Sequence, residues 1–310
     1  MDFAIGSQST RQIFIELLDL PFPDGAPQTV ENFLRYIESI DPDTNAVVRR
    51  YDNTFIHRSI SGFVIQGGGF AYTPNPQGED FARDFTEVVI DLDANGQEIT
   101  VPNEFDASRS NVRGTVAMAK VGGDPDSATS QWFINIGNNA GNLDNQNGGF
   151  TVFGRVIGMT ADNAGTTVAD EIAALATANK TDVHSAFSNL PLFGFTQGDP
   201  IPDVSSTNLV RLVSATVVEL VQPSALDFGL TPLDTTRTQT VTVENRTDFA
   251  FTILSVGDGL QQPFSILSGD ENCSNKLLGT INDSLASRTC SIIVSFHTEQ
   301  AGEINSSLDI

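Results

Sequence analysis

The chain has 310 residues, of which 39 are acidic and 16 are basic, so its formal net charge at pH 7 is −23. This length predicts two domains, and 39% hydrophobic residues are enough to bury a core in each. A surface this acidic repels phosphate backbones and anionic membranes, and only three lysines are present, so we expect no nucleic-acid partner.

The N-terminal residues 1–7 carry no basic, apolar targeting segment, and no stretch of the chain approaches the roughly 18 apolar residues of a membrane span. We therefore expect no direct membrane insertion of this segment. Met1 is compatible with removal of a signal peptide. The sequence does not tell which residues flank it in the natural protein.

The first two thirds of the chain consist mostly of short runs with a two-residue hydrophobic period, bounded by glycine, asparagine and aspartate, which is typical of β-strands. Two segments instead place apolar residues on one helical face: 29–39, where Thr29 is the expected N-cap, and 167–177. Two helices among many strands predict a β-barrel. The strands are expected at 13–17, 63–66, 115–119, 132–136 and 151–156.

Residues 91–96 read DLDANG, which matches the opening of a D-x-D-x-N-G calcium loop. The twelfth position, where such a loop has a bidentate glutamate, is Pro102. Asn95 and Gly96 also form the best type I′ hairpin turn, and the flanks are strand-like. The turn is the favoured interpretation and the calcium loop the alternative.

The character of the sequence changes after Pro223: runs rich in β-forming residues recur at short spacing, and no helical period is present. Regular short strands separated by turn residues predict a β-sandwich of about 90 residues. We place the domains at 1–221 and 222–310. The strands are expected at 226–229, 240–244, 251–254, 264–266 and 290–296.

Both cysteines, Cys273 and Cys290, lie in this second part, 17 residues apart. In strand-rich sequence this favours one disulfide across a loop over two free buried thiols. A disulfide would indicate export, because cytosolic thiols stay reduced.

Residues 57–69 read HRSISGFVIQGGG and bring an arginine, a phenylalanine and a glutamine near one another. In a strand the side chains alternate, so Phe63 and Ile65 share one face and Val64 and Gln66 the other, unless glycine bends the strand. Here the sequence resembles the cyclophilins, the peptidyl-prolyl isomerase family with the signature F-H-R-x-x-x-G-F-x-x-Q-G-G. Further resemblance follows in order across about residues 11–220, at 29–33, 103–105, 114–119, 130–134 and 152–156.

The resemblance implies a mainly β fold: a closed eight-stranded antiparallel barrel with two helices, with the active face outside the barrel and no metal or cofactor. By position it makes Arg58, Phe63 and Gln66 catalytic, with Arg58 as the catalytic arginine, while His57 is expected to be a packed structural histidine. The residues matched with the proline pocket and its rim are Phe63, Val64, Phe133, Leu143 and Phe150, and those matched with the groove for the peptide backbone are Gln66, Ala119, Lys120 and Gln131.

The reaction explains these residue types. Rotation about an X-Pro bond is opposed by amide resonance, with a barrier of about 18–20 kcal/mol, and it requires no nucleophile or metal. A guanidinium that donates to the prolyl nitrogen favours the twisted state over either planar one. Arg58 suits this role because it stays charged and presents fixed donors.

The pocket rim departs from the family pattern. Asn142 precedes Leu143, where many cyclophilins have an aromatic residue, often tryptophan, and Phe150 stands where most have histidine. An enlarged loop, 144–149, lies between them. Because cyclosporin-type ligands depend on the missing tryptophan, the resemblance implies weak or no cyclosporin binding.

The second part of the chain resembles, more loosely, the immunoglobulin-like modules of bacterial surface proteins called choice-of-anchor or ASPM-SPD2-Hydin-like. The sequence as a whole therefore predicts an exported bacterial isomerase, periplasmic, secreted or on the cell surface, that acts on proline-containing segments of unfolded or surface proteins. The alternative is a non-catalytic protein that binds proline peptides, or an adhesive surface protein, with the barrel as scaffold.

Overall fold

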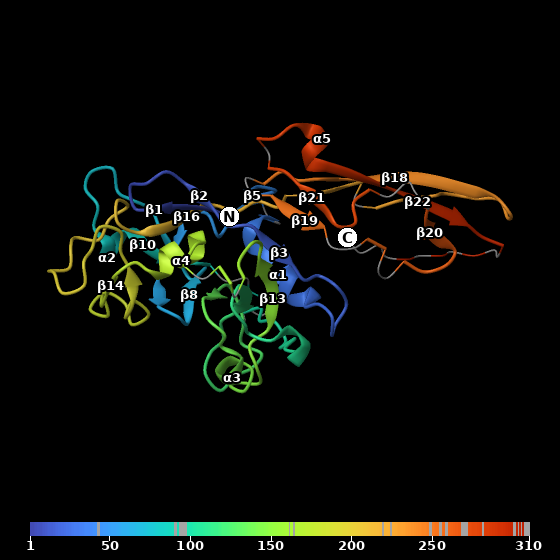
Figure 1. The fold of residues 1–310 in the computed structure, drawn as a ribbon. Coiled ribbons are helices and arrows are strands. Elements are labelled where there is room, and N and C mark those ends of the chain that lie inside the picture. The colour runs from blue at the N-terminus through green and yellow to red at the C-terminus, as the bar shows by residue number, and fades with distance from the viewer. Residues whose placement is uncertain are drawn as a thin grey trace. The chain divides into compact units, whose positions relative to one another are not determined.

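The computed structural model divides the chain into two compact units, Met1–Thr216 and Val217–Ile310 (Figure 1). No helix in the described part of the chain is long and apolar enough to cross a membrane. The structure describes residues 1–310 apart from 42–43, 90–91, 93–97, 161, 164, 219, 224, 248–249, 254–255, 258–259, 268–271, 281, 300–301, 303, 305 and 307–310.

The first sheet of the N-terminal unit is antiparallel and has the strand order β10–β9–β6–β16–β1–β2. Its centre joins the two ends of the unit, because Ile5 of β1 lies opposite Val210 of β16. Both side chains point into the main core. The strands are β1 (Asp2–Ile5), β2 (Arg11–Gln12), β6 (Thr54–Phe55), β9 (Phe70–Tyr72), β10 (Phe85–Glu87) and β16 (Val210–Ser214).

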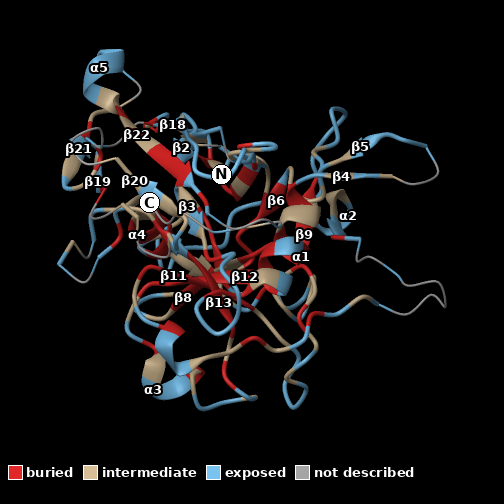
Figure 2. Cartoon of the chain, turned by 90° about the vertical axis from the view of Figure 1, so that its right-hand side faces the viewer, coloured by how far each residue is buried: buried red, intermediate tan, exposed pale blue. Residues whose placement is uncertain are grey.

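The second sheet, also antiparallel, has the order β3–β13–β11–β12–β8–β7 and contains the five strands predicted from the two-residue period. Alternate residues serve opposite faces, so Val116 and Met118 enter the main core while Ala117 between them does not. Figure 2 shows buried residues gathered around β8, β11, β12 and β13. The strands are β3 (Ile15–Leu17), β7 (Arg58–Ile60), β8 (Val64–Gly67), β11 (Thr115–Met118), β12 (Trp132–Asn135) and β13 (Val152–Val156).

Both predicted helices are confirmed, as α1 (Pro27–Ile37) and α4 (Val168–Ala173), and both pack on the main core. The N-cap prediction for Thr29 is wrong, because α1 begins at Pro27, whose fixed φ suits the first turn. The buried carboxylate of Glu104 takes the capping role instead: it accepts from the backbone N of Gln28 at 3.1 Å and of Thr29 at 2.7 Å. The helix start is therefore set by a residue far away in the sequence.

In the described residues, the sequence analysis missed three further helices, each a single turn of four residues: α2 (Phe81–Asp84), α3 (Ala140–Leu143) and α5 (Leu285–Arg288). Four residues are too few for a 3.6-residue period to appear in a sequence. A 3₁₀ turn, η1, spans Ala107–Arg109. The paired strands β4 (Ser39–Ile40) and β5 (Val47–Val48), and β14 (Thr177–Ala178) and β15 (Leu190–Pro191), complete the unit.

The C-terminal unit has a four-stranded sheet, β17–β18–β22–β20, and a separate pair, β19–β21. The strand predicted at 226–229 is wrong, and two side chains of β18 show why. Arg237 donates to the carbonyl of Phe228 and Gln239 to that of Asp227, so side chains take the place of a neighbouring strand. The strands are β17 (Val221–Gln222), β18 (Thr236–Glu244), β19 (Phe251–Ile253), β20 (Phe264–Ile266), β21 (Lys276–Leu278) and β22 (Thr289–His297).

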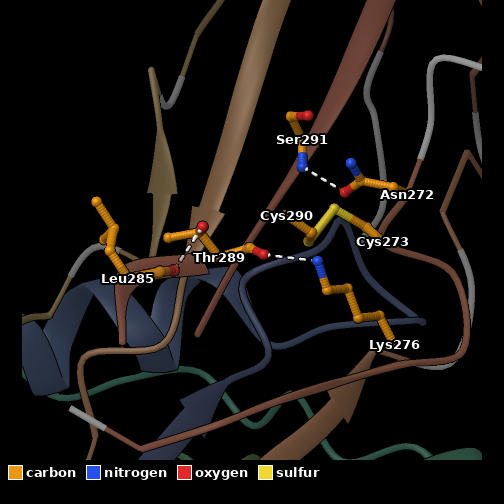
Figure 3. Close-up of a disulfide and its surroundings, with 7 residues drawn as sticks. All are labelled: Asn272, Cys273, Lys276, Leu285, Thr289, Cys290 and Ser291. Atoms are coloured by element: carbon orange, nitrogen blue, oxygen red, sulfur yellow. Dashed lines mark hydrogen bonds between the residues drawn. A yellow bond between two sulfur atoms is a disulfide. The ribbon is translucent and has the colours of Figure 1, made fainter. Parts of the chain in front are cut away.

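Cys273 and Cys290 form a disulfide with an S–S distance of 2.03 Å and a Cα–Cα distance of 5.1 Å (Figure 3). Hydrogen bonds fasten the same segment to β22: Lys276 Nζ donates to the Thr289 carbonyl at 2.8 Å, and Ser291 N donates to Asn272 Oδ1 at 2.9 Å. Both sulfurs belong to the core of this unit.

Most of the predicted turn or calcium loop at 91–96 lies outside the described residues. Leu92, the described residue of this segment, forms an isolated antiparallel bridge with Glu98.

Candidate active site

Three polar side chains form a row on the outer face of the second sheet. Arg58 of β7 lies opposite Gln66 of β8, and its Nη1 donates to Gln66 Oε1 at 3.3 Å. Gln66 Nε2 donates in turn to Oε1 of Gln131, just before β12, at 2.9 Å. Each of the three is half-buried. The row therefore presents a guanidinium and two amides in fixed relation to one another.

The glycine run at 67–69 makes this row possible. Gly68 has φ +79°, and a Cβ there would lie 2.6 Å from the carbonyl oxygen of Ser130. A Cβ on Gly69 would lie 2.8 Å from the side-chain amide of Gln131. At Gly68 only glycine lets the chain pass this close to the Ser130 backbone, while at Gly69 the absence of a side chain leaves room for Gln131 in its present position.

Beside the row lies an apolar cluster that is separate from the main core and is called here the pocket cluster. Phe133 of β12 and Ala117 of β11 are opposite each other at its centre, and the ring of Phe150 packs edge-on against Phe133 with 5.8 Å between centroids. The buried members are Leu18, Val64, Ala117, Phe133, Leu143 and Val152, and Phe63, Ala119 and Phe150 are partly exposed at its surface.

The structure brings together every apolar residue that the sequence matched with the proline pocket. Sequence reasoning missed Leu18, Ala117 and Val152. Ala117 lies opposite Phe133 on one side and Val152 on the other, so strand alternation identifies it once the pairing is known. Leu18 follows β3 and carries no such signal.

The place of Phe63 corrects the alternation expected for residues 63–66. Ile65 enters the main core, whereas Phe63 packs on the pocket cluster together with Val64. The strand β8 begins only at Val64, and Gly62 before it has φ +70°. The glycine turn therefore takes Phe63 out of the strand pattern and onto the outer face.

Arg58 connects the polar row to the pocket cluster. Its Cζ lies 5.9 Å from the centroid of the Phe63 ring, within range of a cation–π interaction. The ion pairs found among the described residues do not include Arg58. Partial burial lowers the pKa of the Arg58 guanidinium below its usual range. A bound ligand would meet a desolvated donor beside an aromatic wall.

The enlarged loop 144–149 is a closed turn next to the pocket cluster. At its start, Asp144 Oδ1 accepts from the backbone N and from Nδ2 of Asn111, both at 2.9 Å. At its end, Phe150 N donates to the Leu143 carbonyl at 3.1 Å. These bonds fix where the ring of Phe150 enters the rim.

Lys120 holds the same loop from the side. Its Nζ donates to the carbonyls of Asn147 and Gly149 at 2.9 and 2.5 Å, and it lies 5.0 Å from the centroid of the Phe150 ring. Burial lowers the pKa of this ammonium to about 8, although two nearby aspartates oppose the shift. The ammonium is thus directed to the loop, and a peptide contact of Lys120 would fall to its backbone.

His57 is confirmed as a packed histidine. It is 1% exposed, and its ring lies 5.0 Å from that of Phe70 between centroids. Burial, and then the charge of Arg58, lowers the pKa of His57 to about 3, so the imidazole is neutral at pH 7. It supports β7 from within the unit.

No group of three or more histidine, cysteine, aspartate or glutamate side chains able to hold a metal ion occurs in the part of the chain that the structure describes. The aspartates nearest Lys120 bind backbone groups instead. Asp126 Oδ1 accepts from Asn103 N at 2.8 Å, and Asp124 Oδ1 accepts from Asp126 N at 3.1 Å. What the site offers is a charged donor, two amides and an apolar pocket.

Comparison with known proteins agrees with this geometry. A family model described as cyclophilin type peptidyl-prolyl cis-trans isomerase/CLD matches residues 5–187. The peptidyl-prolyl cis-trans isomerase cyp18 of Streptomyces antibioticus is 40% identical over 152 residues, which are 48% of this chain and 72% of that protein. The peptidyl-prolyl cis-trans isomerase A of Dickeya dadantii is 35% identical over 156 residues, 50% of this chain and 64% of that protein.

Among solved structures, a cyclophilin type peptidyl-prolyl cis-trans isomerase of Cryptosporidium parvum, crystallised in the presence of the dipeptide Ala-Pro, is 23% identical. It covers 51% of this chain and 78% of its own, with a TM-score of 0.31. The family match, by contrast, includes every residue of the polar row and of the pocket cluster.

Proposed function

The chain belongs to the cyclophilin-type peptidyl-prolyl cis-trans isomerase family, and we propose that Arg58 and the pocket cluster of its first unit carry out this isomerisation on proline-containing peptide segments. The observation that carries the proposal is the position of the Arg58 guanidinium. It lies beside Phe63 at the edge of an apolar pocket and is tied to the row of amides. The arrangement of Arg58, Gln66, Gln131 and the pocket cluster does not include the paired carboxylates or the nucleophile that hydrolysis would require.

The mechanism follows from the electronic structure of the peptide bond. In the planar cis and trans states the prolyl nitrogen shares its lone pair with the carbonyl, and in the twisted state the lone pair is localised on nitrogen. A donor aimed at that nitrogen stabilises the twisted state more than either planar state, which lowers the barrier. Arg58 would supply this donor, and its partial desolvation strengthens the interaction.

The remaining site residues would confine the rotation to one bond. The pocket cluster would hold the pyrrolidine ring between Phe63, Phe133 and Phe150, while Gln66 and Gln131 would hold the peptide backbone. Ala119 and the backbone of Lys120 would line the groove beside them. If the ring and the flanking chain are both fixed, the bound substrate can relax only by rotation about the X-Pro bond.

For the architecture, we propose that eight of the twelve strands in the two sheets of the first unit form a closed barrel. A single core with members from β1 and β16 on one side and from β8, β11 and β12 on the other supports this closure. For the second unit we propose an immunoglobulin-like sandwich, supported by its two sheets around one core. We propose that the two domains meet within residues 216–221.

For location, the proposal is a bacterial protein exported to the periplasm, the cell surface or the medium, where its substrates would be unfolded or surface proteins. The disulfide supports an oxidising compartment, and both relatives described above are bacterial. Weak or no cyclosporin binding is part of the proposal, because Asn142 in α3 stands next to Leu143 where the ligand would need an aromatic ring.

A coupled assay on a proline tetrapeptide tests the function directly. We expect the wild type to be active and Arg58→Ala to lose about 10²–10³ in rate, the usual cost of removing one preorganised donor. Its melting temperature should barely change, because surface substitutions usually stay within about 0.5 kcal/mol.

The control is Arg155→Ala, which removes an exposed arginine from β13 of the same sheet and should leave the rate unchanged. Full activity of Arg58→Ala would contradict the catalytic role of this residue. An inactive wild type that still binds the peptide would show that the protein binds proline peptides without catalysing their isomerisation.

A further inference from the structure

Three buried asparagines form a continuous chain of hydrogen bonds behind the pocket cluster. Asn139, Asn135 and Asn111 are 8%, 0% and 0% exposed, respectively. Asn139 Nδ2 donates to Asn135 Oδ1 at 2.7 Å, and Asn135 Nδ2 donates to Asn111 Oδ1 at 3.2 Å. The three amides therefore point the same way along one line.

Each end of this line holds the backbone of an aromatic pocket residue. At one end, Asn139 Nδ2 also donates to the carbonyl of Phe63 at 2.9 Å. At the other, Asn111 Nδ2 donates to the carbonyl of Phe150 at 2.8 Å and to Asp144 Oδ1 at 2.9 Å. Phe63 and Phe150 are the two rings at the exposed surface of the pocket cluster, and they are 87 residues apart in the sequence.

The direction of the donors gives the line a single arrangement. Each amide oxygen that links two asparagines accepts from the amide nitrogen before it, and Asn135 Nδ2 also donates to Thr115 Oγ1 at 2.9 Å. Turning the Asn135 amide over would therefore place its NH₂ group against that of Asn139 and its oxygen against that of Asn111. In a buried site such a mismatch is costly, because an unpaired polar group there cannot turn to water. The middle amide therefore fixes the orientation of both neighbours.

The position of Asn135 ties the line to the pocket and not to the main core. It is two residues after Phe133 on β12, so strand alternation puts both on the outer face, while Trp132 and Ile134 enter the main core. A residue at this position could fill the space with apolar atoms. The amide of Asn135 instead hydrogen-bonds to Asn139 and Asn111, which hold the backbones of Phe63 and Phe150.

We propose that Asn139, Asn135 and Asn111 are positioning residues that set the spacing between Phe63 and Phe150, and so determine how tightly the pocket grips the proline ring. This inference rests on the function proposed for the pocket cluster. It assigns no contact with substrate to the asparagines, which act only through the backbones of the two aromatic residues.

The test is Asn135→Ala, which breaks the line at its middle without touching either aromatic residue. With a proline tetrapeptide as substrate, we expect KM to rise about tenfold, the effect of losing a buried hydrogen-bonded link, while kcat stays within about twofold because Arg58 is unmoved. Unchanged KM, or a loss confined to kcat, would overturn the inference.

Asn208→Ala is the matched control, because Asn208 is also a buried amide with two hydrogen bonds, to Asp203 O at 3.0 Å and from Ser205 N at 2.9 Å. It lies outside the asparagine line, so its loss should lower the melting temperature and leave KM unchanged. If both variants raise KM equally, loss of stability and not the line explains the effect.

A second measurement does not depend on turnover. Hydrogen exchange at the amides of Phe63 and Phe150, which donate to Ile60 and Leu143, should become faster at both places in Asn135→Ala and at neither in Asn208→Ala. An inactive wild type would overturn the proposed function, and the exchange rates would then still decide whether the line connects the two walls. Exchange unchanged at both amides would overturn the inference.

Discussion

The two faces of the second sheet are made by alternate residues of the same strands, yet they differ in what covers them. The inner face is closed by the first sheet and by α1 and α4, and Trp132 and Ile134 on it are fully buried. On the outer face, α3 contributes Leu143 and the following loop leads to Phe150, and Phe133 is buried while Gln66 beside it stays half-exposed. The difference teaches that one strand can serve stability with one set of side chains and ligand binding with the other.

The polar groups of the two faces differ in the same way. The inner face contributes apolar side chains to the main core, whereas the outer face combines an apolar pocket with the Arg58 row and the asparagine line. Buried polar groups add little net stability for the desolvation that they require. Their concentration on the outer face indicates that this face is organised to hold binding groups in place. Substitutions there should mainly affect ligand binding, and substitutions on the inner face should mainly affect stability.

The largest effect on stability is expected from Trp132→Ala, which deletes the only tryptophan from the inner face. Removing a large buried aromatic residue costs about 3–5 kcal/mol in unfolding free energy, because the lost contacts leave a cavity. Chemical denaturation measures this loss. A stability within 1 kcal/mol of wild type, on the order of a surface change, would show that the inner face does not carry the core.

Its sequence neighbour gives the sharpest contrast. Phe133→Ala should lower the unfolding free energy by about 3 kcal/mol, the lower end of the same range, because one side of the ring borders the accessible pocket. Unlike Trp132→Ala, it should also raise KM for a proline peptide by about tenfold, since it removes the pocket floor. A change in stability with unaltered KM would contradict the division between the two faces.

Removal of the disulfide should alter neither the stability of the inner face nor ligand binding at the outer face of the second sheet. The variant with both Cys273→Ser and Cys290→Ser should destabilise the second unit by about 3 kcal/mol, because the unfolded loop between the cysteines is no longer restricted. Isomerase activity should be unchanged. Two thermal transitions, of which only one shifts, would support this expectation, and a parallel loss of activity would show that the outer face depends on the second unit.

The smallest effect is expected from the titration of Lys120. The ammonium loses one of its donors as the pH rises through its pKa of about 8, so its hold on the loop that carries Phe150 weakens and KM should rise about twofold. Lys120→Met should show a flat profile. A step near pH 8 that persists in Lys120→Met would assign the titration to another group.

The same group has the opposite effect on stability. Its pKa in the folded protein lies below the usual lysine value of 10.5, so between about pH 8 and 10.5 the folded state binds fewer protons than the unfolded state. The unfolding free energy should therefore rise across this window because of Lys120, while the grip on the substrate falls. A pH series of melting temperatures for wild type and Lys120→Met isolates this contribution.

Among the described residues, local patterns in the sequence were enough to predict five of the six strands of the second sheet, four strands of the C-terminal unit and both longer helices. The two-residue period of 115–119 and 132–136 predicted β11 and β12, and the helical face of 29–39 predicted α1. Resemblance of the motif around Arg58 predicted which side chains would meet. These predictions succeeded because each depends on residues a few positions apart, or on a motif whose spacing is preserved along the chain.

The tertiary structure alone decided how the outer face is assembled. Asn139 meets the carbonyl of Phe63 across 76 residues and Gln66 meets Gln131 across 65, and no local period marks either contact. The strand prediction for 226–229 failed for the same reason. The residue pattern there is typical of a strand, but side chains of β18 donate hydrogen bonds to the carbonyls of this segment. Periodicity determines which face a residue occupies, whereas hydrogen-bond partners depend on which distant segments the fold brings together.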